Sequence, residues 1–195
     1  TLTTVKGFAC WPDKTEAEIE ANEVTTVTVN LKRMTDLNAK GWYGGSTHVH
    51  MNYGGNLSNT HENLMMMSEG EDQDIVLHQI ANKDNRILDY HSFVKGGGPH
   101  PLSRSDMVIV VGQEYRPPFW GHVFMFGMRD HLISPFLTGY EGTAIESLYP
   151  SNTDMFRKAK AQGGYVGYVH AYGGGEIDPL ETELGGASPG RGSFQ

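Results

Sequence analysis

The chain has 195 residues, of which 23 are acidic and 15 are basic, so its formal net charge is −8. This balance argues against a nucleic-acid partner, because phosphate backbones are held by clustered Lys and Arg. A single cysteine, Cys10, excludes an internal disulfide and a cysteine-based zinc cluster. No apolar run approaches the roughly 18–20 residues that span a bilayer, so the sequence predicts a soluble protein without a membrane partner. The compartment stays open, because removal of an N-terminal signal would be compatible with export.

The first 40 residues predict the tail of a β-rich, sandwich-like module. In VTTVTVNL, from Val24 to Leu31, apolar side chains alternate with polar ones in the period of a half-buried strand. A domain with a different pattern follows at residues 41–174. Residues 175–195, rich in Gly, Glu and Pro, show no periodicity and are predicted to form an irregular tail.

Strand and helix patterns alternate through residues 41–174. Strands are predicted at Ser46–Met51, Ile75–Ala81, Met107–Glu114, His122–Gly127 and Tyr165–His170. One helix is predicted between a Thr60 cap and Gly70, with the apolar run Leu64–Met67 as its packed face. A second helix begins at Ser151 or Thr153 and ends at Gly163. This order predicts an α/β fold with a parallel sheet, wound either open or into a barrel.

His48-Val49-His50 is the strongest local signal for chemistry. Alternate side chains of a strand share a face, so both imidazoles point the same way and are able to hold one metal ion. The alternative is a pair of polar residues on an exposed strand face. Taken alone, the motif does not decide between these two readings.

Three further residues at strand termini favour the metal. Glu114 ends a buried apolar strand, where a carboxylate costs several kcal/mol to desolvate unless it meets a cation. His122 opens the next strand and His170 closes the last one. Ligands of nitrogen and carboxylate oxygen without sulfur suit Zn, Mn or Fe(II).

A polar cluster at residues 82–86 follows the strand Ile75–Ala81. There Asp84 is a candidate for holding a water molecule or orienting a ligand, and Lys83 or Arg86 is a candidate for neutralising an oxyanion; of these, Asp84 and Lys83 are the candidate catalytic residues. A simple turn explains the same residues equally well. The five remaining histidines are interpreted as structural: His61, His78, His91, His100 and His131.

Five segments together resemble a known family. In chain order they are GWYGGSTHVHMNYGG, ANKDNRILDY, GQEYRPPFWGHVFMFGMRD, SLYPSN and GYVHAYGG. They are similar to the carbaryl-hydrolase-like branch of the PHP (polymerase and histidinol phosphatase) metallohydrolases, over about Gly41 to Gly174. The resemblance implies an incomplete, distorted PHP-type (β/α) barrel preceded by a short β-rich segment.

The resemblance also implies a role for each metal ligand. His48 and His50 would bind a first metal ion, Glu114 would bridge two ions, and His122 with His170 would bind the second. The family's TDH motif reads Asn82-Lys83-Asp84 here, and a histidine expected shortly after His50 is Asn56. These departures imply two divalent ions rather than three.

The family's late-strand aspartate and final barrel strands have no counterpart, since Asp178 lies in an aperiodic stretch. The chain is therefore either a fragment or a diverged relative with an incomplete site.

Two functions from different classes follow. The first is a hydrolase in which two metal ions activate a hydroxide that attacks a phosphoester, ester or carbamate of a small-molecule substrate. The alternative is a non-catalytic structural subunit that self-assembles through the exposed sheet edges of a truncated barrel.

Overall fold

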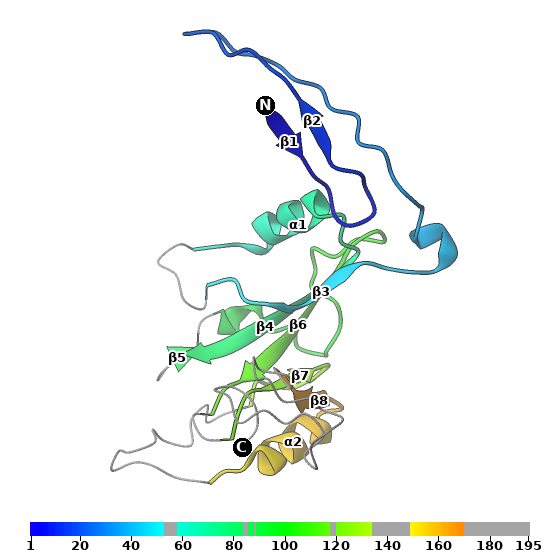
Figure 1. Ribbon diagram of the computed structural model, residues 1–195. Coiled ribbons are helices and arrows are strands. Elements are labelled where there is room, and N and C mark those ends of the chain that lie inside the picture. The colour runs from blue at the N-terminus through cyan, green and yellow to red at the C-terminus, as the bar shows by residue number, and fades with distance from the viewer. Residues whose placement is uncertain (53–57, 84–85, 88, 118–119, 134–148, 170–195) are drawn as a thin grey trace, which may run out of the picture.

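The computed structural model of the chain describes residues 1–52, 58–83, 86–87, 89–117, 120–133 and 149–169 (Figure 1). Its main feature is a mixed sheet that curls into a five-stranded half-barrel with few helices. The strands follow the order β3 (Gly45–Val49), β4 (Ile75–Lys83), β6 (Val108–Tyr115), β7 (Val123–Phe126) and β8 (Tyr165–Tyr168). The short β5 (Arg86–Ile87) pairs with β4 alone.

The strand directions correct part of the sequence prediction. β3, β4 and β6 are parallel, as predicted, whereas β7 is antiparallel to β6 and β8 is antiparallel to β7. The connection from β6 to β7 is too short for a parallel crossover, which needs about a dozen residues. As a result Tyr115 pairs with Val123, and Val123 pairs with Tyr168. The start of β7 and the end of β8 therefore lie at the carboxyl end of β6.

Helix α1 (His61–Gly70) begins where the sequence predicts, because the Thr60 side chain accepts a hydrogen bond from the backbone of Asn63. Leu64 and Met65 are buried against the apolar side chains of β4 and β6. Met66 and Met67 are 63% and 59% exposed, so the prediction of one packed methionine face is wrong for these two residues. Consecutive helical positions point in different directions, which leaves only part of the run against the sheet.

Helix α2 (Asn152–Ala161) is capped by Ser151, in a capping box with Asp154. This decides between the two predicted caps, Ser151 and Thr153. Met155 and Ala159 are fully buried in a second core cluster, together with Tyr115, Val123, Met125, Met128 and Ile133. The helix thus covers the antiparallel half of the sheet. Two 3-10 turns complete the elements of the described chain, at Asn38–Lys40 and Tyr90–Ser92.

The N-terminal segment differs most from its prediction. β1 (Leu2–Thr4) and β2 (Asp13–Thr15) form an antiparallel pair, but the predicted strand at Val24–Leu31 is not a strand. Val24 is 94% exposed, and alternation alone does not make a strand without a neighbouring ladder of hydrogen bonds. Figure 1 shows this segment leading away from the curled sheet. No helix in the described part of the chain is long and apolar enough to cross a membrane.

Gly112 in β6 provides a test of how tightly the half-barrel packs. A Cβ atom there would collide with the Phe126 ring and would lie 2.6 Å from the backbone oxygen of Met125. We expect Gly112→Ala to lower the free energy of unfolding by about 1–3 kcal/mol, the usual cost of overpacking. Urea unfolding followed by circular dichroism measures the effect. Gly70→Ala is the matched control, because nothing lies within 4 Å of its Cβ position, and an equal loss in both variants would contradict the packing described.

Candidate metal centre

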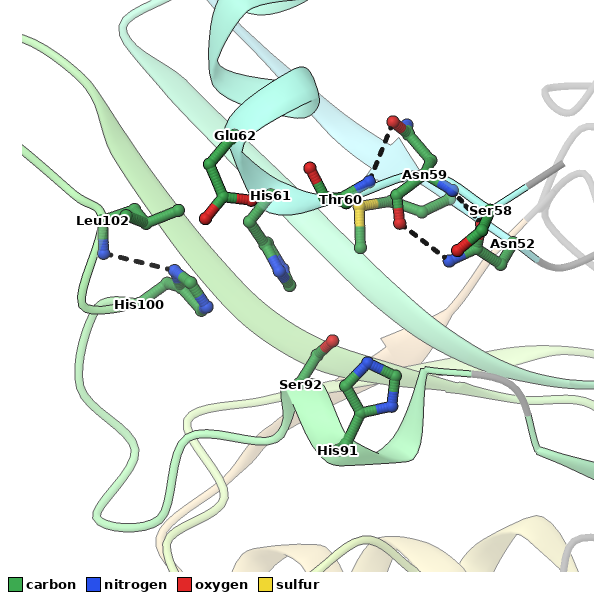
Figure 2. Close-up of a pocket in the computed structure, with 11 residues that line it drawn as sticks. Asn52, Ser58, Asn59, Thr60, His61, Glu62, His91, Ser92, His100 and Leu102 are labelled. Atoms are coloured by element: carbon green, nitrogen blue, oxygen red, sulfur yellow. Dashed lines mark hydrogen bonds between the residues drawn. The ribbon is translucent and has the colours of Figure 1, made fainter.

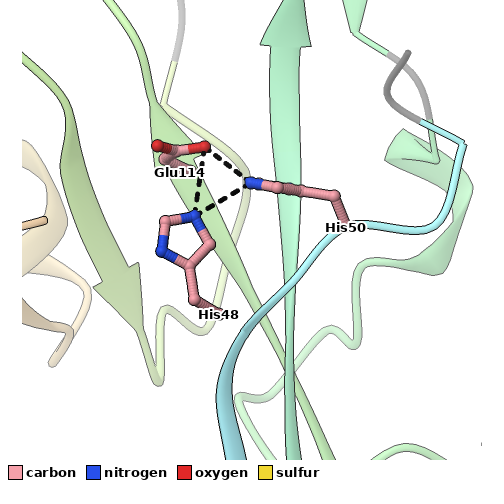
Figure 3. A group of neighbouring side chains, drawn as sticks. All are labelled: His48, His50 and Glu114. Carbon is pink, nitrogen blue, oxygen red and sulfur yellow. Dashed lines mark hydrogen bonds and ion pairs between the residues drawn. The ribbon is translucent and has the colours of Figure 1, made fainter. Parts of the chain in front are cut away.

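His48 of β3, His50 directly after it and Glu114 of β6 bring their side chains together, as Figure 3 shows. The Nε2 atoms of His48 and His50 are 3.0 Å apart. Oε2 of Glu114 lies 2.8 Å from Nε2 of His50 and 3.6 Å from Nε2 of His48. Two nitrogens bound to one tetrahedral zinc ion at about 2.05 Å are separated by about 3.3 Å. The spacing of the two imidazoles is therefore close to that of ligands sharing one ion.

The β3–β4 pairing shifts register at this point, between Ser46 and Val49. The extra residue bends the strand locally, and such bulges often re-aim side chains beside a site. Beyond the bulge, Nδ1 of His50 lies 2.8 Å from the backbone oxygen of Gln79 in β4. A carbonyl oxygen only accepts hydrogen bonds, so Nδ1 must be the protonated nitrogen of His50. Its Nε2 atom lies 2.8 Å from Oε2 of Glu114, so it donates a hydrogen bond there in the imidazolium form and would offer a lone pair to a metal ion in the neutral form.

Glu114 is the buried centre of the group, with only 1% of its side chain exposed. Burial alone would raise the pKa of this carboxyl group, because the charged form loses its hydration. Hydrogen bonds with His122 and His50 outweigh burial and hold the pKa below its ordinary value. The side chain is therefore an anion that its neighbours stabilise, as a metal-binding carboxylate must be.

His122 and Arg116 approach the same carboxylate from the loop between β6 and β7. Nδ1 of His122 lies 2.9 Å from Oε1 of Glu114, on the other oxygen from the one that faces His50. Nε of Arg116 lies 3.6 Å from Oε2 of Glu114 and 3.4 Å from Nδ1 of His122. A permanent cation thus stands beside the proposed metal ligands. His122 directly precedes β7, which runs antiparallel to β6, and this explains why it lies at the end of β6.

The remaining predicted site residues are not placed. His170 and Asp84 lie outside the described residues, and Lys83 is described only as the last backbone position of β4. Within the described residues, His48, His50 and Glu114 form the one group of three side chains whose ligand atoms converge as a metal site requires. Within the described residues, His122 contacts this group through the Glu114 carboxylate.

Sequence reasoning missed three residues that support the group: Gln79, Arg116 and Asn152. Gln79 also donates from its side chain to the backbone oxygen of Thr47, at 2.9 Å, which ties β4 to the bulge. The Asn152 side chain donates to the backbone oxygen of Trp120 at 2.8 Å and holds the loop before His122. A glutamine in the middle of an apolar strand was the available signal for Gln79. Neither Arg116 nor Asn152 carries such a signal, because loop closure brings them to the site.

A groove borders the metal centre on the His48 side. It has a volume of about 440 Å³ and is lined by side chains of β3, β4, β7 and β8. Three aromatic side chains, Phe124, Phe126 and Tyr168, form much of its wall, while Gln79 and His48 supply polar atoms. Ligand sites commonly combine an apolar wall with a few polar groups in this way. A small molecule seated there would lie next to the imidazole of His48.

A second group of histidines lies around α1, in a pocket of about 350 Å³ (Figure 2). Nε2 of His61 is 3.1 Å from Nδ1 of His78, a residue of β4 that is fully buried. The rings of His61 and His100 stack with centroids 3.9 Å apart. Nε2 of His78 lies 3.8 Å from Oδ2 of Asp89, and the Asp89 carboxylate also binds the side chain of Asn52 at 2.6 Å.

Burial makes these histidines neutral at physiological pH. It lowers the pKa of both His61 and His78 to about 4, and repulsion adds to the effect, from His100 for His61 and from His61 for His78. Two neutral imidazoles 3.1 Å apart share a single hydrogen bond and lock the start of α1 onto β4. The histidine pair thus fixes α1 to β4. The same strand also supports His50 through Gln79.

Comparison of the chain with protein-family models, curated proteins and solved structures found no match.

The buried histidine pair makes the stability of the fold dependent on pH. An unfolded histidine has a pKa near 6.5, whereas His61 and His78 have pKa values of about 4, so between these limits the unfolded chain binds more protons. The contribution of the two histidines to stability is therefore present above pH 6.5 and is lost as the pH falls toward 4. We expect the free energy of unfolding to drop by roughly 4 kcal/mol between pH 7 and pH 5, about 2 kcal/mol for each of the two histidines, as shifts of this size imply.

The measurement is urea unfolding at a series of pH values, for the parent chain, His78→Asn and His131→Asn. His78→Asn should flatten the dependence, although the variant is less stable at pH 7. The exposed His131 provides the control and should leave the dependence unchanged. Parallel curves for the parent chain and His78→Asn would show that the buried pair is not the source of the pH dependence.

Proposed function

We propose that the chain is a metal-dependent hydrolase, built on a PHP-like half-barrel, that acts on a phosphoester, ester or carbamate. The observation that carries this proposal is the convergence of His48, His50 and Glu114, with Nδ1 of His50 held by the backbone oxygen of Gln79 so that its Nε2 atom faces the other two side chains. Three protein ligands and an open position are typical of catalytic rather than structural zinc sites. The resemblance of the HxH, strand-end Glu and Trp-Gly-His segments to the PHP metallohydrolases supports the same reaction class.

The donor set fits a divalent cation of the Zn, Mn or Fe type, because imidazole nitrogens and a carboxylate suit these ions. A cation held there would lower the pKa of water toward neutrality and so supply hydroxide for attack. In the overall reaction water adds across the scissile bond, so that hydroxyl joins the phosphorus or carbonyl carbon and a proton joins the leaving group. The resemblance assigns a second cation to His122 and His170, with Glu114 as the bridge.

The residues around the proposed ligands would orient them, seat the substrate and supply a positive charge. Gln79 orients His50, and the groove beside His48 is able to seat the apolar part of a small substrate. Arg116, whose Nε atom lies 3.6 Å from Glu114, places a positive charge where an oxyanion would develop. From the sequence we also propose Lys83 and Asp84 as candidates for stabilising an oxyanion and holding a water molecule.

Hydrolysis of p-nitrophenyl phosphate and p-nitrophenyl acetate tests the proposal. Each assay uses the chain stripped with a chelator and then supplied with Zn²⁺, Mn²⁺ or Fe²⁺. We expect activity toward at least one substrate to need added metal. Glu114→Gln should reduce metal affinity and activity by at least about 100-fold, the upper end of what outer-shell changes at metal sites cost.

His131→Gln is the control, since His131 is exposed and its ring lies near Gln162 rather than Glu114. Equal losses in the two variants would show that the site is assigned wrongly. A folded chain that binds no metal and hydrolyses neither substrate would favour the alternative, a structural subunit that assembles through its sheet edges.

A further inference from the structure

Gln79 carries a buried acceptor for which the described part of the chain supplies no donor. Its side chain lies 2.9 Å from the backbone oxygen of Thr47, and because a carbonyl oxygen only accepts, the atom facing it must be the amide nitrogen. This fixes the position of the amide oxygen, Oε1, which is buried and has no hydrogen-bond partner among the described residues. An acceptor buried in this way is destabilising unless something pairs with it.

The face of β4 that carries the Gln79 side chain belongs to the groove beside His48. Leu77 and Gln79 are two positions apart in the strand, so their side chains share a face, and both line the groove. His78, between them, faces α1 instead. The unpaired acceptor therefore belongs to a residue in the wall of the groove that borders the candidate metal centre.

Two aromatic rings of the same groove rest on glycines of neighbouring strands. A Cβ atom at Gly167 would lie 2.6 Å from the Phe124 ring, and one at Gly112 would collide with the Phe126 ring. Larger residues at these two positions would displace both rings, so the glycines allow the rings to lie close to the sheet. A groove of about 440 Å³ with such a wall suits a planar apolar molecule.

We propose that Gln79 is a specificity-determining residue, which selects planar aromatic molecules that carry an N–H or O–H group. The apolar body of such a molecule would pack on Phe124 and Phe126, and its donor would pair with Oε1 of Gln79. A molecule of the same shape without a donor would leave that oxygen unpaired and bind more weakly. The proposal rests on the proposed function only for the fate of the ligand, because it names the substrate class that the groove would bring to the metal centre.

The test compares indole, which has an N–H donor, with benzothiophene, which has nearly the same shape and no donor. Dissociation constants are measured by NMR titration of the folded, metal-free chain, so that the result depends neither on catalysis nor on metal binding. We expect indole to bind about tenfold more tightly, as one hydrogen bond of ordinary strength implies. Gln79→Met, which removes the acceptor, should bring the ratio of the two constants close to one.

Gln79→Glu separates this role from a purely structural one. Both substitutions remove the amide nitrogen that donates to Thr47, but only Gln79→Glu keeps an acceptor at the end of the side chain. It should therefore keep the preference for indole, even where a looser strand weakens the binding of both molecules. Phe124→Leu should weaken both molecules alike, because it changes the wall and leaves the acceptor in place.

Gln73→Met is the matched control, because Gln73 precedes β4 and does not line the groove; it should keep the ratio of the parent chain. Equal constants for the two molecules in the parent chain, or the same preference in Gln79→Met, would overturn the role of Gln79. A folded chain that binds neither molecule would overturn the groove as an aromatic site. These results would leave the metal site in place, whereas a failure to bind metal would leave the preference for indole unchanged.

Discussion

The buried carboxylate of Glu114 has to be compensated, and much of the structure around it follows from that requirement. It lies at the carboxyl end of the central strand β6, with 1% of its side chain exposed. An unpaired charge in such a place costs several kcal/mol or more. Imidazoles reach it from the end of β3 on one side and from the β6–β7 loop on the other, and Nε of Arg116 lies 3.6 Å from its Oε2 atom. The shared carboxylate thus couples strands that do not pair with each other.

The reversal of strand direction after β6 gives the site its asymmetry. The parallel strands β3 and β6 contribute residues from their carboxyl ends, as α/β folds commonly do. His122 comes from the position directly before the antiparallel β7, because a short loop returns the chain to the same edge. β4 supports His50 through the backbone oxygen of Gln79. The buried His78 of the same strand binds α1 through His61. A single strand therefore links the candidate metal centre to the core that holds the helix.

Local signals predicted most of the helices and strands around the sheet and singled out the three side chains that converge, but not what tertiary contacts decide. The caps at Thr60 and Ser151 bond to backbone groups three residues away, so they are readable from the sequence. The HxH spacing likewise predicts a shared face. The segment Val24–Leu31 has the period of a strand, yet a strand needs a partner that periodicity does not supply. Arg116 was missed for a similar reason, since nothing in Tyr-Arg-Pro-Pro indicates which carboxylate the arginine meets.

The position of a bound metal ion tests the central claim most directly. Crystals grown with Zn²⁺ at neutral pH, and measured at the zinc absorption edge, would locate the ion by its anomalous scattering. We predict a strong peak at about 2.0–2.2 Å from Nε2 of His48, Nε2 of His50 and Oε2 of Glu114. A strongest peak in the His61 and His100 pocket, or none bound by these three atoms, would contradict the account.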